Sequence, residues 1–187
     1  YSLSELPQTG YRPRLADDRV GHFFQQSQDY STDIHFESSR RYVNRWHLEK
    51  ADPSSALSRP KQPIVFWLEN TVPVQYRDAV REGVLLWNKA FERIGFQDAI
   101  EVRQQPDDAD WDPADVRYST LRWFAGYPDT SFAQGPSRTN PLTGQIYDAD
   151  IRFAEGLTRF FRREINEVIS PVTMPGLEQA PRPFLAP

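Results

Sequence analysis

Hydrophobic residues are densest between residues 63 and 103, and their spacing there changes in an informative way. Residues 64–68 form an unbroken apolar run of strand length, which is typical of a strand buried on both faces. Over residues 73–94 the apolar positions recur every three or four residues, the spacing of one helical face. These positions are Tyr76, Val80, Val84, Trp87, Phe91 and Ile94. Gly95 follows at a position that favours helix termination. The pattern predicts a buried strand and then a long helix packed on a sheet.

Shorter patterns after this helix predict the rest of the sheet. Residues 99–103 and 119–125 have the length and alternation of strands. Residues 131–138 and 145–153 flank a turn-rich loop and predict a hairpin, and residues 157–169 predict a further helix. Together these elements predict an α+β fold, in which a twisted mixed sheet of four to five strands is backed by one long helix.

The ends of the chain differ from this centre. Residues 1–62 predict a β-rich appendage, the tail of a preceding region, with strands near 19–24 and 41–48 and a linker at 51–62 that is rich in Pro and Ser. Residues 63–170 form the main predicted unit. Residues 171–187 are Pro-rich and predict a mobile tail. The chain lacks an initiating Met, so we expect it to be a piece of a longer protein.

Composition narrows the classes of function. Hydrophobic residues make up 39% and charged residues 26%, enough for one core of moderate size. A net charge of −4 argues against a nucleic-acid partner, because phosphate binding needs clustered Lys and Arg. The sequence has no run of about 18 apolar residues, so we expect no membrane span. It contains no Cys, which rules out disulfides and thiolate nucleophiles.

Histidine and serine offer little chemistry in this sequence. The three histidines, His22, His35 and His47, are each more than four residues from the next, so no helical zinc pair exists. Ser137 lies in a Gly-Pro-Ser-Arg-Thr segment that lacks the second glycine of a nucleophile elbow. Serine hydrolysis is therefore not indicated.

Two groups of aspartates leave alternatives open. Asp108, Asp110 and Asp112 alternate as in a calcium loop, but Pro113 stands where that loop needs glycine. A solvated loop with turn-capping aspartates is the other interpretation. Asp148 and Asp150 share one face of a predicted strand, so they are candidates for glycoside hydrolysis or for structural hydrogen bonds.

The order of predicted elements resembles the N-terminal subdomain of metzincin-type zinc peptidases. More closely, the sequence is similar to a family of large bacterial zinc-dependent metallopeptidases that are secreted or periplasmic. The resemblance covers roughly residues 10–170. Six segments carry it, namely residues 14–23, 42–50, 63–70, 82–91, 135–138 and 148–153.

This resemblance implies a zinc held by a His-Glu-x-x-His motif and a third His, with the Glu as general base for peptide hydrolysis. The motif does not occur in these 187 residues. We therefore expect the zinc ligands in the missing C-terminal half of the catalytic domain, with no zinc and no activity in this chain alone. The resemblance also implies that the intact parent protein is periplasmic or secreted and acts on a peptide or protein substrate.

One functional element of the resemblance falls within this sequence. In metzincins an irregular antiparallel edge strand pairs with the extended substrate backbone, and here that strand corresponds to residues 131–138. The implied substrate-binding residues are Ser131, Phe132, Ala133, Gln134, Gly135 and Arg138. An ordinary edge strand, blunted by Pro136, is the alternative.

Other functions stay open at this point. The main rival is a non-catalytic module that binds peptide or carbohydrate through an exposed aromatic platform of Trp46, Trp111, Trp123 and Tyr127. A glycosidase that uses Asp148 and Asp150 is the third possibility.

Overall fold

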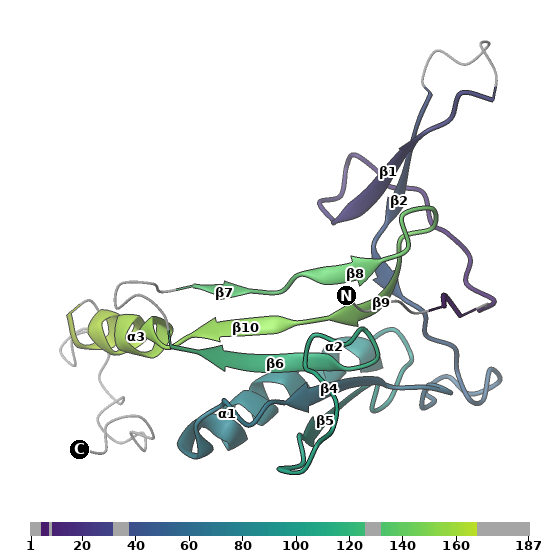
Figure 1. The fold of residues 1–187 in the computed structure, drawn as a ribbon. Coiled ribbons are helices and arrows are strands. Elements are labelled where there is room, and N and C mark those ends of the chain that lie inside the picture. The colour runs from purple at the N-terminus through teal and green to yellow at the C-terminus, as the bar shows by residue number, and fades with distance from the viewer. Residues whose placement is uncertain (1–4, 8, 32–37, 126–131, 168–187) are drawn as a thin grey trace.

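A computed structural model describes residues 5–7, 9–31, 38–125 and 132–167 of the chain. These residues form a five-stranded sheet, a three-stranded sheet, a two-stranded sheet and three helices (Figure 1). The five-stranded sheet is the main sheet. Its strand order is β5 (Ile100–Gln104), β4 (Ile64–Leu68), β6 (Ser119–Phe124), β10 (Ile151–Ala154) and β7 (Ala133–Gln134). Neighbours are parallel except for β7, which is antiparallel to β10, so the predicted α+β fold with a mixed sheet is confirmed.

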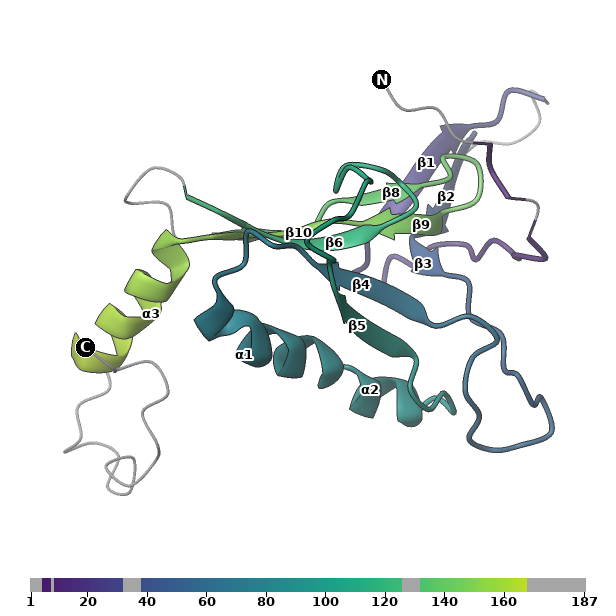
Figure 2. The same ribbon diagram turned by 60° about the horizontal axis from the view of Figure 1, so that its bottom comes forward.

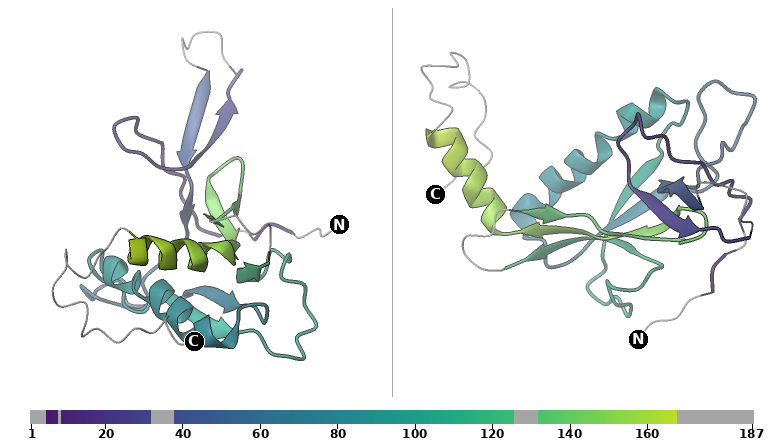
Figure 3. Two further views of the ribbon diagram at one scale, coloured as in Figure 1. Left: turned by 90° about the vertical axis from the view of Figure 1, so that its left-hand side faces the viewer. Right: turned by 90° about the horizontal axis from the view of Figure 1, so that it is seen from above.

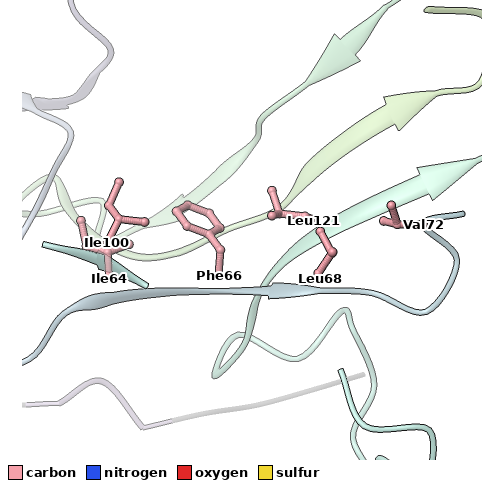
Figure 4. Close-up of a cluster of buried hydrophobic side chains, with 6 residues drawn as sticks. All are labelled: Ile64, Phe66, Leu68, Val72, Ile100 and Leu121. Carbon is pink, nitrogen blue, oxygen red and sulfur yellow. The ribbon is translucent and has the colours of Figure 1, made fainter. Parts of the chain in front are cut away.

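The core lies on one face of the main sheet. Alternate residues of β4 point to this face, and Leu68 pairs in register with Leu121 of β6. Both leucines and Val72 are fully buried, in a cluster that includes Ile64, Phe66 and Ile100 (Figure 4). Val65 and Trp67 on the opposite face are half-buried, so the predicted burial of β4 on both faces is only partial.

The predicted long helix is present and covers this face. It consists of α1 (Val74–Leu85) and α2 (Asn88–Glu92). At the joint the N–H of Trp87 bonds to the carbonyl of Val84 at 3.2 Å, a tighter i to i−3 pattern.

The predicted apolar stripe of this helix is only partly correct. Val80, Val84 and Phe91 pack against the core cluster. Trp87 is 64% exposed and Ile94 is 66% exposed, so neither side chain is buried against the sheet. Ile94 follows the end of α2, next to Gly95, whose φ of 89° is in the left-handed region typical of helix ends.

A long hairpin connects the main sheet to the three-stranded sheet. One arm contains β7 and β8 (Ser137–Thr139), and the other contains β9 (Gln145–Ala149) and β10. The arms are antiparallel in both sheets, which confirms the predicted hairpin. β3 (Arg45–Trp46) completes the three-stranded sheet by pairing with β9. Helix α3 (Gly156–Glu167) follows β10 and lies on the same side of the main sheet as α1 and α2 (Figure 2).

The N-terminal part of the chain forms the two-stranded sheet of β1 (Phe24–Gln28) and β2 (Ser39–Val43), which projects from the end of the main sheet opposite α3 (Figure 3). The prediction of a strand at 19–24 is wrong, because Asp17 accepts the backbone N–H of Arg19 and closes a turn there. The strand predicted at 41–48 is divided at Asn44 into β2 and β3.

The segment predicted to be a linker, residues 51–62, lies against the main unit. The N–H of Ser58 donates to the carbonyl of Gly95 at 3.2 Å, and the N–H of Gln97 donates to Ser58 at 2.9 Å. The division of the chain into three parts stays a prediction.

Candidate functional site

The predicted substrate-binding strand lies at a free edge of the main sheet. Among the described strands β7 pairs with β10 alone, through Ala133 opposite Phe153 and Gln134 opposite Arg152. Ser131, the first residue predicted for this site, lies outside the described residues. The described part of the site therefore begins at Phe132.

The backbone of this edge has a defined direction. The carbonyl of Phe132 accepts the N–H of Ala154 at 3.1 Å, and the carbonyl of Pro136 accepts the N–H of Asp150 at 3.0 Å. Backbone groups of a strand alternate between its two sides, so Gln134 also faces β10. Ala133 and Gly135 therefore present their N–H and C=O groups to the free edge.

Side chains leave this edge open. Residues 132–136 are all exposed, and Phe132 is held by a ring contact with Phe124 at 5.8 Å between centroids. A Cβ on Gly135 would approach no atom closer than 3.9 Å, to Ile151, so packing does not require glycine there. A second strand could approach these backbone groups, which is the geometry of β-strand addition.

Arg138 has a different environment from the rest of the predicted site. Its guanidinium forms an ion pair with Asp148 and lies 3.3 Å from a carboxylate oxygen of Asp150. The Asp148 and Asp150 side chains are only 1% and 3% exposed. Thr120 on β6 donates its hydroxyl to Asp150 at 2.7 Å. Arg138 is thus placed to hold the hairpin arms together, and its part in substrate binding stays a prediction.

The same contacts bear on the aspartate pair proposed for glycoside hydrolysis. Both carboxylates are buried and bound to one guanidinium, which leaves no opening for a sugar between them. One oxygen of Asp148 is buried without a hydrogen-bond partner. These aspartates have the environment of a structural ion-pair cluster.

Other polar candidates also have structural partners. Asp112 accepts the N–H of Ala114 at 2.7 Å, the turn-capping arrangement, and hydrogen bonds from Arg117 lower the pKa of Asp115 to about 2. Nowhere in the described ranges do three His, Cys, Asp or Glu residues come together as metal ligands. Ser137 lies on β8 opposite Ala149, away from any strand-to-helix turn.

The aromatic residues of the rival binding module do not share one surface. Trp46 packs edge-on against Phe66 of the core, at 6.4 Å between centroids. Trp111 contacts Trp67, which points to the face opposite Phe66, whereas Trp123 stacks on Tyr76 of α1. Tyr127 lies outside the described residues. The three described rings therefore form no common platform.

The structure also reveals a groove that the sequence did not predict. A cavity of about 600 Å³ lies between α1, α3 and the core face of β6 and β10. The spacing predicted an apolar face for the helix at 73–94 and a further helix at 157–169. That these helices meet across a gap depends on the position of α3, which no local pattern specifies.

Comparisons with known proteins add one finding. A family model described as a domain of unknown function (DUF5117) matches residues 1–51. No curated protein and no solved structure matches the chain. The match ends before the main sheet begins, so it does not bear on the free edge. Within the described residues, no helix is long and apolar enough to cross a membrane.

Proposed function

We propose that this chain is the N-terminal, substrate-rim part of a zinc-dependent metallopeptidase that hydrolyses peptide bonds, and that the intact parent is periplasmic or secreted. The observation that carries the proposal is the free antiparallel edge of β7, where Ala133 and Gly135 direct backbone donors and acceptors outward. An extended peptide can add to such an edge through its main chain. Peptide binding of this kind tolerates many side chains, which suits a peptidase.

The order of elements supports the same proposal. A strand, a long helix, two strands, an irregular edge strand and a strand that carries acidic residues follow one another as β4, α1–α2, β5, β6, β7–β8 and β9–β10. This is the order on which the resemblance to metzincin peptidases is based. Exposed apolar residues on or next to the helices, including Leu86, Ile94 and Phe160, offer a surface for further chain to cover.

The described residues of this chain do not fit a zinc site. His22 is remote in sequence from His47, whose ring contacts Tyr11 at 5.7 Å, and no group of three metal-ligating residues is found in the described parts. The proposal therefore assigns the zinc ligands and the general base to the missing C-terminal half of the catalytic domain. The role of this chain is to bind and orient the substrate backbone.

The test uses the intact parent with an unstructured peptide substrate. Ala133→Pro removes an outward N–H, so we expect kcat/KM to fall by about tenfold, the effect of one hydrogen bond of about 1.4 kcal/mol. Leu142→Ala, in the exposed loop between β8 and β9 and outside the predicted substrate-binding residues, is the control and should leave kcat/KM unchanged. A parent that shows no chelator-sensitive peptide hydrolysis, or equal rates for both variants, contradicts the proposal.

A further inference from the structure

The outer edge of β1 presents the backbone of a strand to solvent. On its inner side, the carbonyl of Phe23 accepts the N–H of Asn44 at 2.8 Å, so odd-numbered residues of this strand face β2. Backbone groups alternate along a strand, and Phe24, Gln26 and Gln28 therefore direct theirs away from β2. These three residues are exposed, and no described residue bonds to their backbone groups.

Elsewhere in the molecule an outer strand edge is closed by side chains. At β5, the edge of the main sheet opposite β7, the N–H and C=O of Ile100 bond to the side-chain amide of Asn88 at 2.8 and 3.0 Å. Arg81 donates to the carbonyl of Val102 at 2.8 Å. Side chains that occupy the outward backbone groups keep another strand from adding. No described side chain does this at β1, so its edge can take a further strand.

The charge pattern around β1 suits pairing with an identical strand. Residues 24–28, Phe-Gln-Gln-Ser-Gln, contain no charge and no proline, the residues that commonly protect an edge. Charges next to the strand are neutralised within the chain. Asp29 pairs with Arg40 at 2.7 Å, and Asp18 pairs with Arg41 at 2.8 Å. Two copies can therefore approach with little like-charge repulsion, and the two-stranded sheet projects from the rest of the molecule (Figure 1).

We propose that β1 pairs antiparallel with β1 of a second copy, so that two hairpins form one four-stranded sheet. Identical strands paired in this way are related by a two-fold axis, the commonest symmetry of homodimers. With Gln26 opposite its own copy and Phe24 opposite Gln28, every outward backbone group of both strands has a partner, whereas a register shift leaves some unpaired. The Gln26 amides then meet across the axis. A sheet of more than two strands is also more stable.

The proposal is independent of peptidase activity, and disulfide trapping tests its register in the 187-residue chain, which contains no Cys. Cα atoms of directly opposed residues lie about 5.5 Å apart, within the range of a disulfide. We expect Gln26→Cys to form an intermolecular disulfide under mild oxidation. The matched control is Gln28→Cys, also exposed on the same face of β1, whose own copy would lie about 14 Å away along the strand. Gln26→Cys should oxidise at least roughly tenfold faster than this control.

Sedimentation equilibrium measures the association of the chain without cysteine. One strand pair makes a small interface, so we expect a dimer at about 100 µM protein. Gln26→Pro removes an outward N–H from each copy but no bond to β2, and should raise the dimer Kd about thirtyfold. Gln26→Thr keeps this N–H and should leave the Kd within about threefold.

Three outcomes overturn the proposal. The first is a chain that stays monomeric at this concentration, and the second is equal oxidation of the two cysteine variants. The third is a dimer with the same Kd in folded Gln26→Pro, which would place the contact elsewhere, for example at the apolar groove between α1 and α3. Circular dichroism shows whether Gln26→Pro is folded, and if it is not, the cysteine comparison decides.

Discussion

Arg138 shows how strongly one residue can determine local architecture in this protein. Asp148 and Asp150 place two carboxylates in the interior next to the crossing from β9 to β10, and burial of a charge without a partner is costly. The guanidinium of Arg138 on the opposite arm reaches both of them. Thr120 joins the same cluster from β6, so three segments are fixed relative to one another.

Removal of this cation should therefore weaken the fold. We expect Arg138→Met to lower the free energy of unfolding by about 3 kcal/mol, because both buried carboxylates lose their cationic partner. Urea denaturation measures the change. Arg152→Met on the exposed side of β10 is the control and should change stability by less than about 0.5 kcal/mol. Similar losses for both variants would contradict the structural role of Arg138.

Gly144 illustrates a backbone requirement at the same scale. Its φ of 76° is in the left-handed region, and a Cβ there would lie 2.4 Å from the carbonyl oxygen of Val43. We expect Gly144→Ala to destabilise the protein by more than about 1 kcal/mol. Gly83→Ala, in a helix with open space around the position, should instead stabilise it by roughly 0.5–1 kcal/mol. Thermal unfolding of the two variants in opposite directions checks both expectations.

At the scale of elements, helical spacing correctly identifies a helix but not the full extent of its buried face. Steps of three and four residues place apolar side chains on one side of a helix. Whether each of these side chains is buried depends on whether the sheet extends beneath it. Phe91 packs against the core, whereas Ile94, three residues later, is mostly exposed.

This difference predicts unequal costs of truncation. Phe91→Ala should lower the free energy of unfolding by about 2–3 kcal/mol, because a ring packed on the core leaves a cavity. Ile94→Ala should cost less than about 0.5 kcal/mol, as is usual for an exposed side chain. Chemical denaturation of both variants under the same conditions makes the comparison. A larger loss for Ile94 would mean that the sequence stripe, and not the observed contact, describes the packing.

At the scale of the whole molecule, the two proposed binding surfaces lie on different parts of one scaffold. β7 offers backbone groups at one edge of the main sheet, and β1 offers them at the outer edge of the two-stranded sheet. Neither surface supplies metal ligands. We expect the purified 187-residue chain to contain no stoichiometric zinc by elemental analysis and to leave casein intact. Stoichiometric zinc accompanied by casein hydrolysis would show that the ligands are in this chain after all.

The free edge could be placed in part from sequence. The turn-rich loop at 139–144 predicted the hairpin, and the resemblance implied an edge strand at 131–138. The role of Arg138 could not be predicted, because a lone arginine on a strand has the same local pattern whether it binds substrate or a buried carboxylate. The groove was not predictable either, since its walls come from α1, β6, β10 and α3.

The sequence by itself determined the elements whose signals are local, such as the strand at 64–68, the helix that follows it and the long hairpin. These depend on alternation and turn chemistry among near neighbours in the chain. Only the tertiary structure decided which apolar faces are covered, which carboxylates share Arg138 and where backbone groups remain free. Burial and pairing depend on segments far apart in sequence, and their cost or gain arises only when those segments meet in space.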